Sequence, residues 1–169
     1  MERGWSSRAG MVTVRLAVAT DVPELESIAA AAYLPYVPRL GFVPPPATAD
    51  YAGAVDRGEV WLASTAGRAV ALIVLVAMPR YLLLENVAVI PSLHGYGIGT
   101  GLLAFAEAQA RALGLPEIRL YTNVAMTENQ ALYQRRGYLE THRDTAGELR
   151  RVFFTKRLLS CLRTRPTTG

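Results

Sequence analysis

Four glycines spaced two residues apart, in the run Gly95-Tyr-Gly-Ile-Gly-Thr-Gly101, constrain this chain more than any other feature. The apolar run before them, Tyr81–Ile90, predicts a strand. The run after them carries apolar residues at helical spacing as far as Leu113 and predicts a helix. Because Glu117–Val124 predicts another strand, the order of strand, glycine turn, helix and strand indicates a right-handed crossover between two parallel strands.

The rest of the chain predicts further strands and helices around this unit. The predicted strands are 12–18, 60–64, 69–78, 138–143 and 151–156, and the predicted helices run from 21 to about 34, from 49 to 57 and from 128 to 136. The run Ala69–Met78 has no polar alternation, which predicts a strand buried on both faces. The pattern predicts one α/β domain with a mixed central sheet of about six to seven strands flanked by about four helices.

The chain divides into three parts by its periodicity. Residues 1–10 precede Met11 and show no periodicity, so we expect an N-terminal tail. Residues 11–158 carry the predicted strands and helices, and we expect them to form the domain. Residues 159–169 are expected to form a C-terminal tail.

Charge and composition exclude several classes of function. The net charge of +4 suits an anionic ligand but is too small and scattered for nucleic acid. The longest apolar run is about half as long as a membrane span, and no signal peptide is recognisable. The single cysteine excludes an internal disulfide framework, and His94 and His142 lack metal-ligand spacing. We expect a cytoplasmic protein that binds no nucleic acid, no membrane and no metal.

The glycine turn favours a phosphate ligand. Glycines let the backbone come close to a ligand, and the N-terminus of the following helix attracts anions. The run lacks the lysine and the spacing of a Walker A loop, and it also lacks the third glycine of the dinucleotide fingerprint. A tight turn that binds no ligand remains the alternative on glycine content alone.

Two linked motifs resemble those of the GCN5-related N-acetyltransferases. The first is Glu85-Asn-Val-Ala-Val-Ile-Pro91 followed by the glycine turn, and the second is Asn129-Gln-Ala-Leu-Tyr133-Gln-Arg-Arg-Gly137-Tyr138. The resemblance implies that fold for Val12–Leu158, with acetyl-CoA as the acetyl donor. It implies that the coenzyme pyrophosphate contacts the backbone of Gly95, Tyr96, Gly97, Ile98, Gly99 and Thr100. The pantetheine arm would pair with Val87, Ala88 and Val89.

The match departs from the family pattern at two places. His94 replaces the Gln or Arg that usually opens the glycine motif. Asn129 lies four residues before Tyr133, whereas many relatives have an asparagine seven residues before that tyrosine. This spacing is similar to that of the glucosamine-phosphate acetyltransferase branch, and we expect Asn129 to contact the coenzyme or to bond within the helix. The branch does not by itself imply the substrate.

Acetyl transfer to an amine needs a base and an acid, and two residues are candidates. In the family, the tyrosine at the position of Tyr133 points at the coenzyme sulfur, where a phenol of pKa about 10 can protonate a thiolate whose acid has a pKa near 8.5. Glu85 is the candidate base, acting through water. A carboxylate in so apolar a strand is costly unless it is paired or lies at a wet cleft. The alternatives are core packing for Tyr133 and a simple ion pair or solvent exposure for Glu85.

The sequence does not name the acceptor, which we expect to be a small-molecule or peptide amine. The proline-rich segment 33–48 lies where this family builds the acceptor wall, and its candidates are Tyr33, Tyr36, Arg39 and Phe42. Asn123 is predicted to line the acceptor cleft or to cap a loop. Homodimers are common among relatives, and the residues do not decide this. A non-catalytic acyl-CoA-binding or regulatory module is the alternative function. The missing Walker A and dinucleotide-fingerprint spacings argue against an enzyme that uses another phosphate-bearing cofactor.

Overall fold

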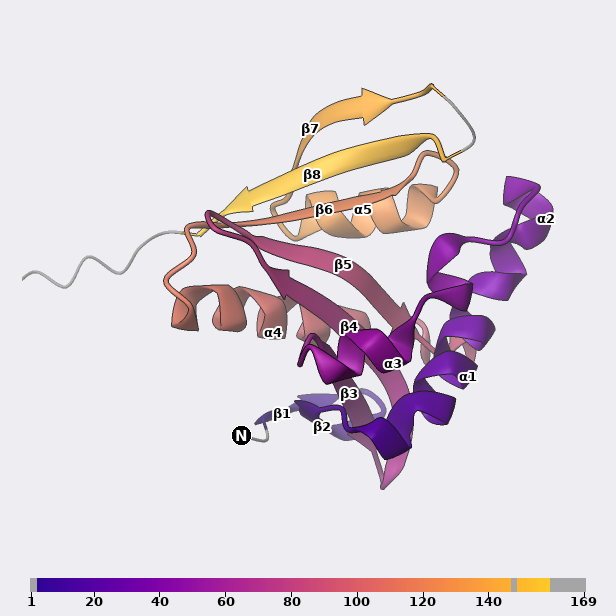
Figure 1. The fold of residues 1–169 in the computed structure, drawn as a ribbon, viewed down its shortest axis with the longest axis vertical. Helices are drawn as coiled ribbons and strands as arrows, with labels where there is room; N and C mark the ends of the chain where they lie inside the picture. The colour runs from indigo at the N-terminus through magenta and orange to yellow at the C-terminus, as the bar shows by residue number, and fades with distance from the viewer. Residues whose placement is uncertain (1–2, 147–148, 159–169) are drawn as a thin grey trace, which may run out of the picture.

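The computed structural model describes residues 3–146 and 149–158 of the chain, which form one mixed sheet with helices on both faces (Figure 1). The strands are β1 Arg3–Ser7, β2 Gly10–Leu16, β3 Val60–Thr65, β4 Arg68–Ala77, β5 Leu82–Val89, β6 Glu117–Asn123, β7 Leu139–Asp144 and β8 Arg151–Arg157. The helices are α1 Val22–Tyr33, α2 Val37–Leu40, α3 Tyr51–Asp56, α4 Ile98–Ala112 and α5 Thr127–Arg135. Short 3-10 turns connect several of these elements.

The eight-stranded sheet has the order β1-β2-β3-β4-β5-β6-β8-β7. All neighbouring strands are antiparallel except β5 and β6, which are joined by the crossover through α4 as predicted. The α/β fold predicted from the sequence is therefore confirmed, with one strand more than the range we expected.

The additional strand is β1, in the segment predicted to be a tail. That prediction is wrong for residues 3–10, because β1 pairs with β2 from Arg3↔Val14 to Ser7↔Gly10. Gly10 has φ of +105°, a backbone conformation that glycine adopts without strain. The predicted tail at 159–169 lies outside the described residues.

A short helix, α2, lies inside the proline-rich segment that was predicted to be a loop. Pro38 occupies its first turn, where a missing N–H costs no hydrogen bond. The helix ends at Gly41, which has a φ of +78° and lies in the left-handed region. The prolines therefore start a helical turn rather than only preventing one.

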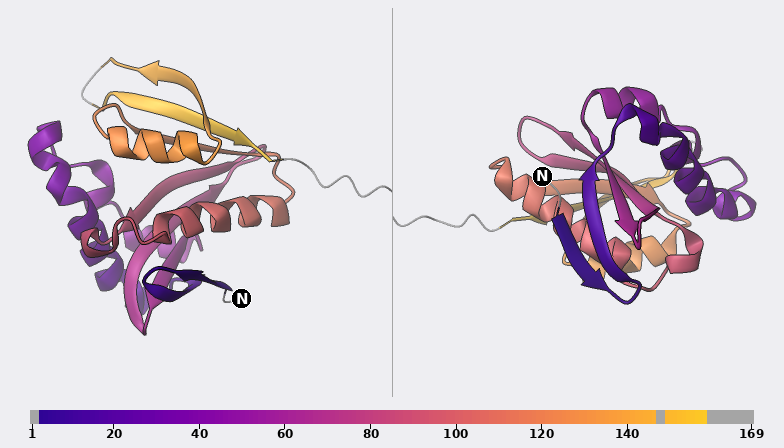
Figure 2. Two further views of the ribbon diagram at one scale, coloured as in Figure 1. Left: turned by 180° about the vertical axis from the view of Figure 1, so that it is seen from behind. Right: turned by 90° about the horizontal axis from the view of Figure 1, so that it is seen from below.

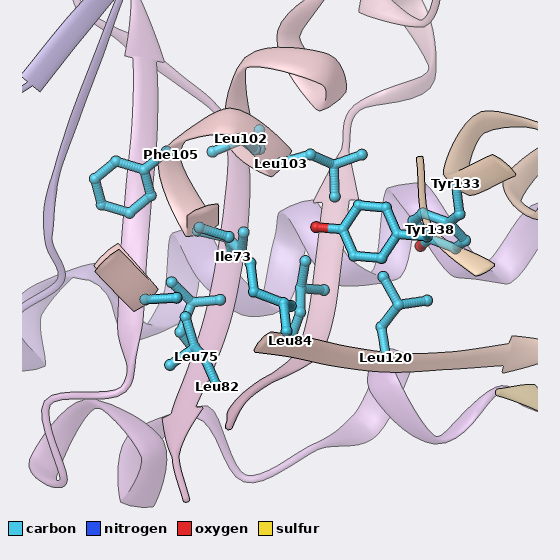
Figure 3. Close-up of a cluster of buried hydrophobic side chains, with 14 of the residues drawn as sticks. Ile73, Leu75, Leu82, Leu84, Leu102, Leu103, Phe105, Leu120, Tyr133 and Tyr138 are labelled. Atoms are coloured by element: carbon cyan, nitrogen blue, oxygen red, sulfur yellow. The ribbon is translucent and has the colours of Figure 1, made fainter. Parts of the chain in front are cut away.

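Helices lie on both faces of the sheet (Figures 1 and 2), and each face carries its own apolar cluster. Helices α1 and α3 pack on one face, against Leu72 and Val74 of β4. Helix α4 packs on the other face, against Ile73 and Leu75 of the same strand. Figure 3 shows the apolar side chains of this second cluster between α4 and the sheet. Strand β4 is therefore buried on both faces, as its unbroken apolar run predicts.

The sheet opens between its two parallel strands. β5 and β6 pair only from Leu82↔Ile118 to Leu84↔Leu120, and β5 continues to Val89 with no partner on that side. Figure 1 shows the two strands close together at one end and apart at the other. The opening exposes a row of backbone N–H and C=O groups on β5.

Candidate functional site

A cavity of about 330 Å³ lies at this opening. It is lined by residues of α1, the proline-rich segment, α3, β5, β6, α5 and the start of β8. The predicted site residues that line it are Tyr33, Phe42, Glu85, Val87, Asn123, Asn129 and Tyr133. These side chains come from five separate stretches of the chain, so the fold brings together most of what the sequence proposed for the reaction centre and the acceptor.

Glu85 lies at a β-bulge. In the pairing of β4 with β5, Val74 faces Asn86 and Leu75 faces Leu84, so Glu85 is the extra residue. Its side chain is exposed, lines the cavity, and has no hydrogen bond or ion pair among the described residues. Glu85 is therefore not ion-paired to any described residue, and its role as a base rather than as a solvent-exposed side chain stays a prediction.

Asn86, the next residue, is a buried polar group that the sequence analysis did not single out. It is 5% exposed, its Nδ2 donates to the Tyr51 hydroxyl at 2.7 Å, and its Oδ1 accepts from the Tyr33 hydroxyl. The Tyr51 hydroxyl donates in turn to Pro46 O at 2.7 Å. This network fixes the cavity wall, because each buried polar group has a partner. An asparagine within an apolar strand was the available signal.

Two tyrosines of this wall are held as neutral phenols. Burial raises the pKa of Tyr33 well above its ordinary value, and nearby tyrosines add to the effect. Burial also raises the pKa of Tyr51, although its hydrogen bond with Asn86 acts in the opposite direction. Both hydroxyls therefore act as neutral donors and acceptors rather than as charged groups.

Tyr133 lies in α5, at the junction between the core and the cavity. It is 5% exposed, and its ring contacts the rings of Tyr138 and Phe154. Burial raises the pKa of Tyr133, so its hydroxyl carries a proton at neutral pH. Among the described residues the Tyr133 hydroxyl has no hydrogen-bond partner, although the side chain lines the cavity. It is therefore a proton donor available to a ligand.

The open edge of β5 presents the backbone groups of Val87 and Val89. The N–H of Ile90 donates to Val70 O on β4, and because successive residues of a strand alternate, Val87 and Val89 direct their N–H and C=O away from β4. Val87 O accepts from the Tyr33 hydroxyl at 2.9 Å, and His94 Nε2 lies 2.9 Å from Val89 O. Ala88 directs its backbone groups to β4. The edge therefore has two N–H groups to offer a ligand.

The glycines of the turn have different roles. Gly95 and Gly97 have φ of +80° and +88°, and Gly97 caps the N-terminus of α4. Gly99 needs no special conformation, because a β-carbon there would make only an ordinary contact with Val89. Gly101 lies within α4, where its missing side chain leaves room for the indole of Trp5 rather than for a ligand.

A second, wider groove of about 800 Å³ runs along this turn. Strand β1 forms one wall, and the Arg8 N–H donates to Tyr96 O at 3.0 Å. Arg3, Arg8 and Arg136 line the groove together with Gly95, Gly97 and Thr100. Ile98, which the sequence analysis also expected at the coenzyme, is buried in the core and does not line the groove. A helix N-terminus and three guanidinium groups make the groove suitable for a phosphate-bearing ligand.

The other predicted acceptor residues lie beside the cavity rather than in it. Arg39 does not line it and forms an ion pair with Glu128 of α5 at 2.9 Å. Its guanidinium carbon lies 5.5 Å from the centre of the Tyr36 ring. Arg39 therefore connects α2 to α5, and the Tyr36 ring packs against its guanidinium.

The two predicted asparagines bond to their own neighbourhood. Asn123 Oδ1 accepts from the Ala125 N–H at 2.9 Å, and its Nδ2 donates to Leu149 O at 3.2 Å, so Asn123 both caps a loop and lines the cavity. Asn129 Nδ2 lies 3.6 Å from Met126 Sδ within the first turn of α5.

Within residues 3–146 and 149–158, none of the helices is long and apolar enough to span a membrane. No three His, Cys, Asp or Glu side chains in these ranges are grouped as metal ligands would be.

Comparison with known proteins identifies a family and a fold. The family model described as "Acetyltransferase (GNAT) family" matches residues 22–138, which is more than half of the chain. A curated relative, the aminoalkylphosphonate N-acetyltransferase of Salmonella typhimurium, is 36% identical over 59 residues. This match spans 35% of the present chain and only 38% of the relative.

Solved structures show the same fold at low sequence identity. The PaiA N-acetyltransferase of Thermoplasma acidophilum, solved with coenzyme A, has a TM-score of 0.74 at 15% identity, with 87% of this chain and 99% of that chain covered. The ribosomal-protein-S18-alanine N-acetyltransferase of Escherichia coli has a TM-score of 0.72 at 19% identity, with 92% and 99% covered. Naa50 of Arabidopsis thaliana, bound to a bisubstrate analogue, has a TM-score of 0.68 at 17% identity, with 86% and 97% covered.

Proposed function

Because this chain belongs to the acetyltransferase (GNAT) family, we propose that it transfers an acetyl group from acetyl-CoA to a primary amine. One observation carries the proposal. Strand β5 runs from the cavity, where Glu85 and Tyr133 lie, to Val89, a few residues before the glycine turn, and Gly95 and Gly97 of that turn line the groove that carries the arginines. A long ligand with an anionic end and a reactive end would therefore contact both.

The residues present fit acetyl-CoA. The groove beside Gly95 and Gly97 would hold the phosphates through backbone N–H groups at the start of α4 and through the arginine side chains. The N–H of Val89 would bond an amide group of the pantetheine arm as a neighbouring strand does, which leaves the N–H of Val87 for the acetyl group. The coenzyme supplies an activated acetyl thioester at the cavity.

The proposed reaction is a direct transfer. The amine nitrogen forms a bond to the acetyl carbon while the bond from that carbon to sulfur breaks, so the thiolate is the leaving group. The proton of the amine goes to Glu85, through water, and the thiolate takes the proton of the Tyr133 hydroxyl. The N–H of Val87 on the open edge would stabilise the negative charge on the acetyl oxygen.

Two measurements test the function. Coenzyme A, but neither NAD nor ATP, is expected to raise the melting temperature of the protein. Thiol release from acetyl-CoA in the presence of amines then distinguishes an enzyme from a non-catalytic binding module, which would be stabilised by coenzyme A and release no thiol. Stabilisation by NAD or ATP in place of coenzyme A would contradict the proposal.

The role of Glu85 is tested by Glu85→Gln with Glu26→Gln as its control. Both carboxylates are exposed, but only Glu85 lines the cavity. Loss of a general base lowers kcat by about 10²- to 10⁴-fold. We expect that loss for Glu85→Gln, with coenzyme A affinity unchanged, and no loss for Glu26→Gln. Equal activity of the two variants would remove Glu85 from the mechanism.

The acceptor class, the branch of the family, the cellular location and the oligomeric state remain predictions. The relative from Salmonella typhimurium makes aminoalkylphosphonates candidate acceptors, and the glucosamine-phosphate branch remains a prediction from the motif spacing. A cytoplasmic location and a homodimer likewise remain predictions.

A further inference from the structure

The cavity carries a carboxylate and a guanidinium on different walls, and neither is paired with another described residue. Of the arginines that line it, Arg57 is bonded to Glu59 at 2.8 Å, whereas Arg151 has no carboxylate partner among the described residues. Of the lining acids, Asp50 accepts from the Gly53 N–H as a helix cap, whereas Glu85 has no partner. Glu85 and Arg151 are therefore the two charges in the cavity that remain to be matched by a ligand.

The sheet register places these two charges on the same face. Leu84 and Leu120 form the last pair between β5 and β6 and pack toward α4, whereas the residues that follow them, Glu85 and Tyr121, both line the cavity on the other face. Arg151 pairs with Asn123 two residues further along β6 and therefore shares the face of Tyr121. The strands thus set an acid on β5 and a guanidinium on β8, with Tyr121 between them.

The position of Arg151 is fixed by its packing. Its guanidinium carbon lies 4.4 Å from the centre of the Tyr121 ring, and that ring packs against Phe153 at 5.8 Å. Arg151 is half-buried, so its charge is less well solvated than that of a surface arginine. A guanidinium over an aromatic ring can still donate from its N–H groups, and these fit a carboxylate or a phosphonate with two hydrogen bonds.

We infer that the acceptor is a small amine that also carries an anionic group, a carboxylate or a phosphonate. This inference rests on the proposed acetyltransferase function. The amine lies toward Glu85 and the open edge of β5, and the anion lies on Arg151. The cavity volume of about 330 Å³ admits a molecule of that size. Arg151 then determines specificity and takes no part in the bond changes.

The test measures thiol release from acetyl-CoA with β-alanine, 2-aminoethylphosphonate and n-propylamine. The first two carry an anion and the third does not, and rates are compared at equal concentrations of the neutral amine. We expect kcat/KM for at least one anionic amine to exceed that for n-propylamine by about tenfold or more, because a charged pocket rejects a ligand that leaves it unmatched. The ratio between the two anionic amines distinguishes carboxylate from phosphonate.

The variant Arg151→Gln should remove that advantage by raising KM for the anionic amines, with a much smaller change in kcat/KM for n-propylamine and with stabilisation by coenzyme A retained. Arg151→Lys should restore part of it. The control is Arg157→Gln, an exposed arginine of the same strand outside the cavity, which should change nothing.

Three outcomes would overturn the inference. If n-propylamine is used as well as both anionic amines, the anion site does not exist, although the acetyltransferase stands. If Arg151→Gln lowers the turnover of all three amines equally, Arg151 is structural. If no amine releases thiol, the proposed function fails, and this inference fails with it.

Discussion

The indole of Trp5 occupies the space in which a side chain at position 101 would lie. A β-carbon on Gly101 would overlap the ring, so α4 and β1 can approach as they do only because residue 101 has no side chain. Gly101 therefore allows the first strand of the sheet to pack against the helix that follows the glycine turn.

Gly101→Ala should destabilise the domain by about 1–3 kcal/mol, the usual cost of overpacking. An alanine in a helix is otherwise favoured over glycine by about 1 kcal/mol. Gly99→Ala, whose β-carbon meets only an ordinary contact at 3.9 Å, is the matched control and should be neutral or stabilising. Urea unfolding measures both. Gly101→Ala should lower the free energy of unfolding by less in a Trp5→Ala background than in the wild type. Strictly additive effects of the two substitutions would contradict the packing argument.

Arg8 in the groove should contribute to coenzyme affinity. Arg8→Gln is expected to raise the Kd for coenzyme A about fivefold at low salt, since an exposed ion pair contributes up to about 1 kcal/mol. The effect should shrink as salt is added. Arg68→Gln, an exposed arginine outside the groove, is the control for net charge. Isothermal titration calorimetry gives the Kd of each variant for coenzyme A at low and at high salt. Equal Kd values for the two variants at low salt would remove Arg8 from the site.

The proton of Tyr133 should remain available at high pH. An acid acts in its protonated form, which exists below its pKa, and burial raises the pKa of Tyr133. The rate should therefore show no alkaline decline due to this residue below about pH 10, the ordinary phenol value. A kcat profile against pH checks this, and a decline with a midpoint well below that value, absent in Tyr133→Phe, would contradict it.

Tyr133→Phe and Tyr138→Phe form a matched pair. The two rings are in contact, but the buried Tyr138 hydroxyl has no hydrogen-bond partner within the described part of the chain, whereas Tyr133 lines the cavity. Tyr133→Phe should lower kcat by about 10²-fold or more. Tyr138→Phe should leave kcat unchanged and raise stability by about 1 kcal/mol, because it removes an unsatisfied polar group. Equal kcat values for the two variants, measured where chemistry limits the rate, would exclude Tyr133 as the acid.

Tyr51→Phe should destabilise the fold by about 1–3 kcal/mol, because it leaves both Asn86 Nδ2 and Pro46 O without their partner. Tyr36→Phe removes a hydroxyl without such bonds and is the control. Thermal unfolding compares the two. A melting temperature equal to that of the wild type for Tyr51→Phe would show that water replaces the lost bonds.

Local patterns predicted most of the fold. The apolar runs gave the seven strands from β2 onward and the four longer helices, and the glycine turn gave the parallel crossover. Strand β1 was missed because it is short, lies at the edge of the sheet, and owes its packing to Gly101, which is distant in sequence. Helix α2 was missed because its prolines were interpreted only as helix breakers.

The sequence predicted those site residues that belong to recognisable motifs. Glu85, Asn129 and Tyr133 belong to motifs with fixed spacing and do line one cavity. Asn86 and Arg151 were missed because their surroundings come from other elements: the partners of Asn86 belong to α1 and α3, and the ring under Arg151 belongs to β6.

The short pairing of β5 with β6 has a mechanical consequence. The two parts of the sheet, β1–β5 and β6–β8–β7, share backbone hydrogen bonds over only a few residues and are otherwise joined by the α4 crossover and by side-chain packing that includes Leu84, Leu120 and Phe154. Packing is not directional as hydrogen bonds are, so the angle between the two parts depends on the volumes of these core residues. Glu85 and Arg151 stand on opposite parts. A methyl group gained or lost in the core behind the opening would therefore change the distance between the Glu85 carboxylate and the Arg151 guanidinium. The preferred length of the acceptor would then change during evolution without any change in the residues that touch the acceptor.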